Sequence, residues 1–202
     1  MNTKNILRYL RIKGEPDALT AALIRDCAAE AKKAVSPTRI YRVCQVSPAP
    51  DGVFLDSELF SGDGIRKRLS GCDHCALFAV TLGAKADLLV RKYAATQPSR
   101  AAVMQAVLAE MTEDQCELLQ KELLAAFPQF AASKRFSPGY PGLPIAFQKQ
   151  FFAMLDLTKR TGVTLTDADM MIPTKTVTAF LGLRLLNAEA GQAVRKDDGA
   201  YE

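Results

Sequence analysis

The chain has 202 residues, a length that fits a single domain with or without terminal extensions. Hydrophobic residues make up 49% of it and charged residues 24%, as in ordinary globular domains that fold in water. The net charge of +4 is small, and Lys and Arg are spread along the chain, which argues against a nucleic-acid partner. No apolar run approaches the ~20 residues that cross a bilayer, so no membrane partner is expected.

Cysteine usage and the N-terminal segment both favour the cytoplasm. The five cysteines are odd in number and lie mostly in apolar segments, as expected where thiols stay reduced and pack as small hydrophobic side chains. Residues 1–14 hold no uninterrupted apolar stretch and no cleavage site of small residues, so they do not resemble a secretory signal.

In the first half of the chain, turn residues separate segments whose apolar spacing distinguishes helices from strands. Asp17 is a suitable N-cap for a helix that Ser36-Pro37 ends. The uninterrupted apolar run 76–82 is typical of a central strand that is buried on both faces. The predicted helices are 5–12, 17–35 and 64–69, and the predicted strands are 38–47, 53–55 and 76–82, the first two joined as an antiparallel hairpin by a wide loop at 48–52.

In the second half, Pro98 stands where a long helix would begin, and Pro128 follows its predicted end. Short helices and strands in mixed order predict an α+β fold, a single domain over residues 1–186 with an antiparallel sheet flanked by helices. The polar segment 187–202 is expected to be a disordered tail. The predicted elements here are helices at 83–93, 98–127 and 146–160, a rigid loop at 137–144, and strands at 164–172 and 176–183.

The segment 135–144 is the most informative part of the sequence, because its last eight residues include three prolines and two glycines. Pro138-Gly139 suits the two central positions of a type II turn, since glycine tolerates the positive φ there. Such a turn places Arg135 and Tyr140 near each other, as a candidate clamp for an amino-acid-like ligand that offers a carboxylate to the guanidinium. On composition alone, simple packing of the two side chains in a stiff loop is the favoured interpretation.

This segment resembles the Arg-x-x-x-Gly-Tyr-Pro signature of the activation domain of cobalamin-dependent methionine synthase, on which Arg135, Gly139, Tyr140 and Pro141 fall. The order and spacing of the motifs carry the resemblance, since each motif is weak alone. Further stretches that resemble the family, mostly its short single-domain members, are 5–14, 41–43, 71–73, 80–83, 165–167, 171–173 and 176–178.

The resemblance implies an activation-domain fold that binds S-adenosylmethionine through Arg135, Gly139 and Tyr140. In that family a flavodoxin or similar donor reduces the inactive Co(II) cobalamin, and S-adenosylmethionine then methylates it. The hypothesis assigns Arg135 to the α-carboxylate of the ligand. It assigns the Tyr140 ring to the adenine or the sulfonium, where a cation–π contact is worth ~0.5–2 kcal/mol. No catalytic acid or base is needed, because the protein supplies positioning and excludes water.

By the same resemblance, an acidic contact to the α-ammonium group or a ribose hydroxyl falls on Glu113. The spacing supports this role, because Glu113 lies on a helical stripe of mostly small residues that runs from Ala102 to Cys116 and lets a ligand approach closely. The sequence leaves an alternative equally open. That alternative is a solvated acidic face shared with Glu110, Asp114 and Glu117.

The leading hypothesis is therefore an S-adenosylmethionine-binding reactivation subunit of a methyltransferase system. The sequence holds no Asp-x-His-x-x-Gly cobalamin-binding motif. The cobalamin is therefore expected on a separate cobalamin-dependent methionine synthase that lacks its own activation domain, with a flavodoxin-like electron donor. The alternative is a non-catalytic docking or assembly module for a corrinoid methyltransferase that has lost ligand binding. Gln105, where short family members usually carry an acidic residue, favours that alternative. A third hypothesis is service to another corrinoid methyltransferase of one-carbon metabolism.

Two other patterns do not amount to sites. Cys72-Asp73-His74-Cys75 holds the one histidine of the chain, but a structural zinc site needs four ligands and no second pair is present, so no metal site is predicted. Gly62-Asp63-Gly64 lacks the Lys-Ser/Thr of a phosphate-binding loop and is interpreted as a turn before a helix.

Overall fold

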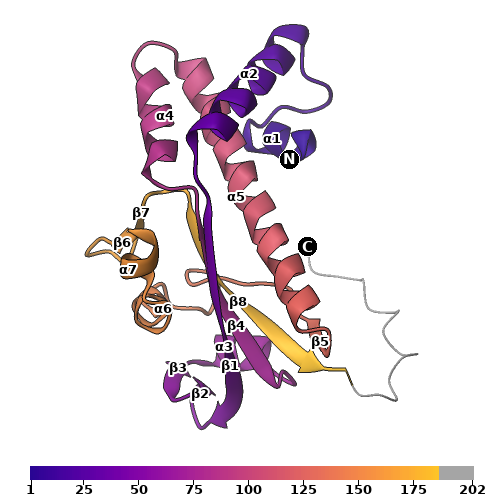
Figure 1. Cartoon of the computed structure of the whole chain (residues 1–202), viewed down its shortest axis with the longest axis vertical. Coiled ribbons are helices and arrows are strands. Elements are labelled where there is room, and N and C mark those ends of the chain that lie inside the picture. Colours follow the sequence, from indigo (N-terminus) through magenta and orange to yellow (C-terminus); the bar gives the residue numbers. More distant parts are fainter. Residues whose placement is uncertain (187–202) are drawn as a thin grey trace.

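The helix α5 (Pro98–Ala126) joins the two parts of the molecule, a group of helices at one end and a β-sheet at the other (Figure 1). A computed structural model describes residues 1–186 of the protein. The expected disordered tail at 187–202 lies outside the described residues. The other helices in the described part are α1 (Thr3–Tyr9), α2 (Ala18–Ala34), α3 (Asp63–Arg68), α4 (Ala84–Ala94), α6 (Phe147–Leu155) and α7 (Leu157–Thr161).

The strands form one large sheet and one small hairpin, and every pair is antiparallel. The hairpin consists of β6 (Thr164–Leu165) and β7 (Met171–Ile172). The predicted single-domain α+β fold, with an antiparallel sheet flanked by helices, is thus confirmed. In spatial order, the six strands of the large sheet are β3 (Glu58–Ser61), β2 (Gly52–Leu55), β1 (Thr38–Ala49), β4 (His74–Thr81), β8 (Thr176–Leu185) and β5 (Phe130–Ala132).

Strand β4 accounts for the uninterrupted apolar run, because both of its faces are buried. Leu77 lies in a core that Phe151 of α6 shares. Its neighbour Phe78 points to the opposite face and packs in a second core with Cys116 and Leu119 of α5. A third core joins α1, α2, α4 and the first half of α5. The prediction of a central, fully buried strand is confirmed.

Several helices begin where the sequence places a cap. The Thr20 N–H donates to Asp17 Oδ1 (2.7 Å), so Asp17 caps α2 as expected. Pro98 is the first residue of α5, where its missing N–H breaks no hydrogen bond. Gly83, with a φ of +79°, precedes α4. Local chemistry therefore sets these boundaries.

Two hairpins differ from the prediction. The loop between β1 and β2 is not wide, because Ala49 and Gly52 are register partners and only two residues turn the chain. The single strand predicted at 164–172 is wrong, because the chain reverses within it to form the hairpin of β6 and β7. A hydrogen bond from the Asp169 N–H to the Thr166 carbonyl (3.0 Å) closes that turn.

The single helix predicted at 146–160 is in fact two helices. Asp156, with a φ of +51°, separates α6 from α7, because a left-handed residue interrupts a right-handed helix. The prediction also omits β3 and β5, edge strands of four and three residues that are too short for a clear alternation of apolar and polar side chains.

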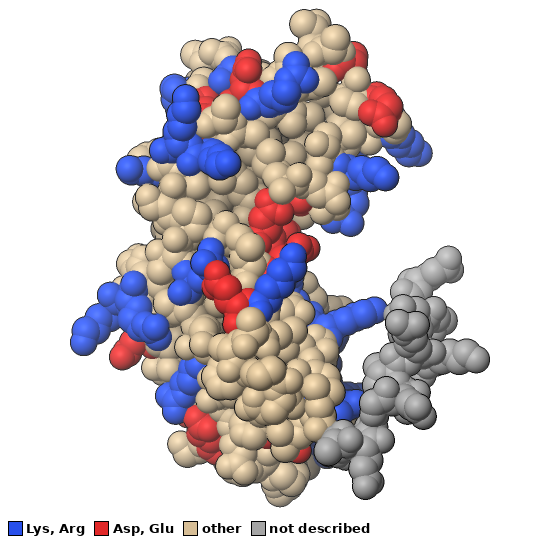
Figure 2. Space-filling view, turned by 45° about the vertical axis from the view of Figure 1, so that its right-hand side comes forward, with Lys and Arg blue, Asp and Glu red and all other residues tan. Residues whose placement is uncertain are grey.

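Charged side chains of both signs are distributed over the surface. The face shown in Figure 2 carries Lys and Arg in its upper and lower parts, with Asp and Glu among them. Among residues 1–186, no helix combines the length and the apolar character that crossing a membrane requires.

Candidate functional site

Two consecutive turns build the loop that follows Arg135. The Tyr140 N–H donates to the Ser137 carbonyl (3.2 Å), and the Leu143 N–H donates to the Tyr140 carbonyl (2.8 Å). Each turn has proline second and glycine third, and Gly139 and Gly142 have φ values of +88° and +76°, as type II turns require. The predicted turn is present, and a second one of the same kind follows it.

Contacts at both ends hold this loop in place. Phe136 and Phe180 of β8 exchange two backbone hydrogen bonds (3.1 and 2.8 Å), and their rings stack with centroids 5.1 Å apart. At the other end, Gly142 lies so close to Gly64 of α3 that a Cβ at residue 64 would overlap the Gly142 carbonyl. The sequence predicts Gly64 in a turn before this helix; it is instead the second residue of the helix, where its missing side chain makes room for the loop.

A cleft of about 270 Å³ lies beside the loop and brings together three of the predicted ligand contacts, Glu113, Arg135 and Tyr140. Gly139, the fourth predicted site residue, shapes the turn and does not line the cleft. Other hollows in the described part are larger, at about 430, 510 and 600 Å³, but none combines these three side chains. The remaining lining residues are Ser137, Pro138, Ile145, Gln148, Asp169, Met170, Met171, Thr176, Val177 and Thr178.

Arg135 and Glu113 form an ion pair in the wall of the cleft. Nη2 of Arg135 donates to Glu113 Oε2, and within residues 1–186 Nε and Nη1 of Arg135 donate to no side chain or carbonyl. The two side chains are 25% and 38% exposed, so solvent reaches the pair. Of the alternative acidic face, Glu117 is exposed as expected, whereas Glu110 is buried and accepts a hydrogen bond from the Asn2 N–H (2.8 Å).

Buried polar side chains that the sequence reasoning missed also line the cleft. The Thr178 hydroxyl donates to Gln148 Oε1 (2.8 Å) in a buried contact between β8 and α6. Gln148 follows Phe147 on the buried side of α6, and a polar residue in that position is a signal that could have found it. Thr178 and Asp169 lie in or near stretches that carry the family resemblance, yet neither was assigned to the ligand.

Gln105 lies away from the cleft. It is exposed on α5, eight residues before Glu113, which corresponds to about 12 Å along the helix. It is not among the lining residues. The departure from the family at this position therefore removes no group from the cleft.

Buried cysteines, among them Cys75 next to the one histidine, pack in the cores on the two faces of the sheet. Cys75 is fully buried in β4, and the His74 ring lies against Phe130 with centroids 5.0 Å apart. Burial raises the pKa of Cys44 and of Cys116 to about 12, so both thiols are protonated at neutral pH. Within the described residues, no three His, Cys, Asp or Glu side chains are grouped so that they could hold a metal ion.

Comparison with known proteins extends the motif resemblance. A family model described as vitamin B12 dependent methionine synthase, activation domain, matches residues 57–185. Among solved structures, the crystal structure of the MetH reactivation domain bound to AdoHcy is similar with a TM-score of 0.65 and 18% sequence identity, over 89% of this chain and 74% of that chain. The sequence matches no curated protein. The predicted resemblance and fold are confirmed.

Proposed function

Because the chain belongs to the family of vitamin B12-dependent methionine synthase activation domains, we propose that it binds S-adenosylmethionine in this cleft. In this proposal it supports the reductive methylation of cobalamin on a separate methionine synthase that lacks an activation domain. The observation that carries the proposal is the meeting of Glu113, Arg135 and Tyr140 in one cleft.

The ion pair of the cleft suits the amino-acid end of this ligand. Arg135 has Nε and Nη1 donors that no described side chain or carbonyl uses, so the guanidinium can donate to a ligand carboxylate as well as to Glu113. Glu113 offers its carboxylate to the α-ammonium group beside it. The pair therefore presents a cation and an anion where the ligand has an anion and a cation.

The rim of the cleft suits the adenosyl end. Tyr140, Ile145 and Met170 line it and are exposed, so an aromatic base can lie against apolar atoms there. The volume of about 270 Å³ is slightly below the usual range for small-molecule pockets, which begins at about 300 Å³. A ligand of this size is thus held with part of its surface exposed, as is required of a methyl donor that meets a cofactor on another protein.

The chemistry asks little of this chain beyond position. The partner's cobalamin, once an electron donor such as a flavodoxin has reduced it, supplies the nucleophile that accepts the sulfonium methyl group. The residues of the cleft bind the donor and orient its sulfur. Buried free thiols such as Cys44 and Cys116 suit a reducing compartment, which supports the proposed cytoplasmic location.

Calorimetric titration with S-adenosylmethionine tests the proposal. The wild-type chain is expected to bind, and Arg135→Ala is expected to weaken binding at least about tenfold, because the ligand's carboxylate loses its charged donor. Arg91→Ala is the matched control, since Arg91 is exposed on α4 and does not line the cleft. No heat and no thermal stabilisation at millimolar ligand would refute the proposal.

One observation favours a second candidate, a docking module that has lost its ligand. The Arg135 guanidinium already donates a hydrogen bond to Glu113, so a ligand carboxylate would have to bind the same guanidinium together with Glu113. In this case the chain would form a complex with a corrinoid methyltransferase, either a methionine synthase or another enzyme of one-carbon metabolism, without binding S-adenosylmethionine. Co-purification with such a partner and silent titrations would together identify this role.

A further inference from the structure

Asp169 is the one charged lining residue that the proposed function leaves without a role. It comes from the turn between β6 and β7 and is only 9% exposed. Its Oδ1 atom is buried and accepts no hydrogen bond from residues 1–186. The ion-pair partner of that atom is Lys149, whose Nζ is 3.5 Å away on a side chain that is 70% exposed and does not line the cleft.

A buried carboxylate oxygen without a hydrogen bond lowers the stability of the folded state, because it has lost its hydrogen bonds to water and has formed none with the protein. A single exposed lysine compensates for little of that cost, since solvent screens the pair. Because Asp169 lines a ligand-sized cleft, a positively charged ligand group is the expected missing partner of its carboxylate.

The turn fixes the position of this carboxylate. Asp169 has a φ of +57°, and the Thr166 N–H donates to the Met170 carbonyl (2.9 Å) across the turn. The Met170 N–H in turn donates to the Thr166 hydroxyl (3.2 Å). Glycine is the residue that suits a left-handed position in such a hairpin. Aspartate also tolerates this region, and here it adds a carboxylate whose position the turn fixes.

We propose that Asp169 is the counter-ion of the ligand's sulfonium and makes the cleft prefer S-adenosylmethionine to S-adenosylhomocysteine. This inference rests on the proposed function. Arg135 and Glu113 neutralise each other, as do the α-carboxylate and α-ammonium of the ligand. Lys149, the ion-pair partner of Asp169, lies outside the cleft, so the charges that remain inside it are the negative charge on Asp169 and the positive charge on the sulfonium. The demethylated product is a thioether without that charge, so its release after methyl transfer is favoured.

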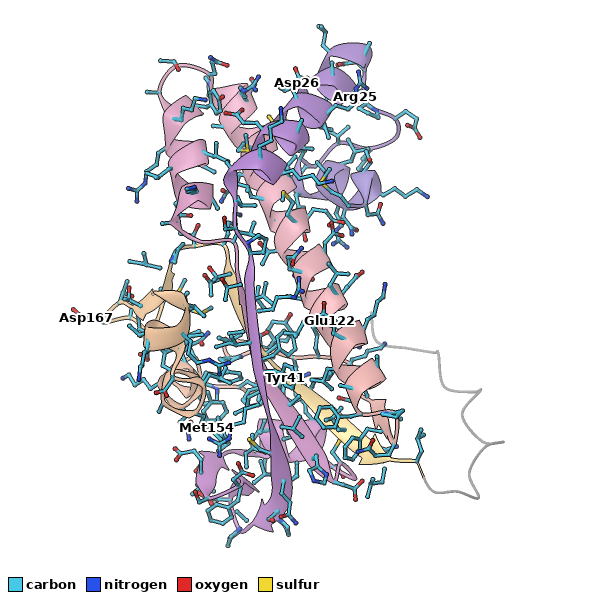
Figure 3. All side chains as sticks on the ribbon, viewed as in Figure 1. Arg25, Asp26, Tyr41, Glu122, Met154 and Asp167 are labelled. Atoms are coloured by element: carbon cyan, nitrogen blue, oxygen red, sulfur yellow. The ribbon has the colours of Figure 1, made fainter. Side chains whose placement is uncertain are left out.

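Calorimetric titration of the full chain with both ligands tests this preference. Asparagine has nearly the shape of aspartate and also tolerates the left-handed region, so Asp169→Asn keeps the turn. This variant is expected to bind S-adenosylmethionine about tenfold more weakly than the wild type does, and S-adenosylhomocysteine less than about twofold more weakly. Asp167→Asn is the matched control, because Asp167 projects outward from the same turn (Figure 3) and does not line the cleft.

The outcomes separate the two proposals. If Asp169→Asn lowers the affinity for both ligands equally, the carboxylate contacts a part that they share, such as the ribose. The inference is then overturned, while the proposed function stands. Unchanged affinity for both ligands overturns it as well. If the wild-type chain binds neither ligand, the proposed function fails and the inference fails with it. Asp169→Gly, which relieves the positive φ, is expected to keep the melting temperature and lose the preference.

Discussion

A guanidinium that already holds one carboxylate has room for another, because it carries five N–H donors in one plane. Arg135 donates to Glu113 from Nη2, and Nε and Nη1 stay available to a ligand. Because the pair is formed before the ligand arrives, less side-chain motion has to be frozen on binding. If the proposed function is right, the ion pair therefore binds the α-carboxylate and α-ammonium groups of the ligand and does not block them.

Glu30 of α2 connects three helices. It accepts hydrogen bonds from Lys92 Nζ (2.8 Å) and the Tyr93 hydroxyl (2.7 Å) of α4, and from Arg100 Nη2 (3.0 Å) of α5. The hydrogen bond from Lys92, followed by that from Tyr93, lowers the pKa of the Glu30 carboxyl to about 2. The guanidinium of Arg100 also lies 4.7 Å from the centre of the Tyr93 ring. One carboxylate thus holds the helical end of the molecule together.

Replacing Glu30 makes stability less dependent on pH. Because the folded-state pKa of about 2 lies below the ordinary 4.5, the contribution of the carboxylate is present above pH 4.5 and is lost as the pH falls toward 2. Glu30→Gln is expected to lower the free energy of unfolding by about 1 to 2 kcal/mol at neutral pH, after allowance for solvent screening. Urea unfolding at several pH values checks this.

The matched control is Glu122→Gln, because Glu122 pairs with Arg39 at an exposed position on α5. This variant is expected to change the free energy of unfolding by less than about 1 kcal/mol. Equal losses of stability on acidification in the wild type and in Glu30→Gln would contradict the argument for Glu30.

Among the elements, the loop that carries Tyr140 depends on a close approach of two backbones. Gly64 is the second residue of α3, and Gly142 is the third residue of the turn that runs from Tyr140 to Leu143. A side chain at either glycine meets a different obstacle: at Gly142 the φ of +76° disfavours it, and at Gly64 the loop itself is in the way. The helix therefore serves as a support on which the loop is seated.

Gly64→Ala is expected to displace the loop. The new Cβ overlaps the Gly142 carbonyl, and relief of such an overlap costs about 1 to 3 kcal/mol of folding stability. Since the displaced loop carries Tyr140, affinity for S-adenosylmethionine is expected to fall even below the melting temperature. Thermal unfolding and titration measure the two effects. Lys67→Ala, at an exposed position of the same helix, is the control, and a Gly64→Ala protein with wild-type affinity would show that the loop does not depend on this contact.

Elements with local signals were predictable from the sequence, and those that depend on partners were not. The predicted range of helix α5 is right to within one residue, because Pro98 marks its start and Pro128 follows its end. The sequence predicts one strand where the hairpin of β6 and β7 lies, because each of these strands has two residues and the polar turn between them resembles part of an alternating strand. Periodicity needs more residues than these strands contain.

The same distinction applies to the cleft. Arg135 and Tyr140 were placed together correctly, since five residues and one turn determine their proximity. Asp169, Gln148 and Thr178 come from three other elements, and only the pairing and packing of the sheet bring them to the same place. No spacing along the chain encodes that meeting, so the presence of Asp169 in the cleft was not predictable.

At the scale of the whole molecule, residues outside the family match belong to the same cores as those inside it. The match begins at residue 57, yet β1 pairs with β4 at eight positions, from Thr38 opposite Thr81 to Gln45 opposite His74. In the helical core, Ile6 and Cys27 are fully buried beside Met104 of α5. The N-terminal segment is therefore part of the folding unit and not an attachment to it.

A chain shortened to residues 57–202 is accordingly expected not to fold cooperatively. Loss of β1 leaves the central strand β4 with an unpaired edge, and such an edge recruits other chains. Loss of α1 and α2 uncovers the apolar side of α5 that Ile6, Ile24 and Cys27 cover in the intact chain. Circular-dichroism melting and gel filtration measure the result, with a chain of residues 1–186 as the control that keeps every described element. A monomeric 57–202 chain with a sharp melting transition would mean that the matched region alone contains a sufficient core, and that the N-terminal helices serve a purpose other than folding.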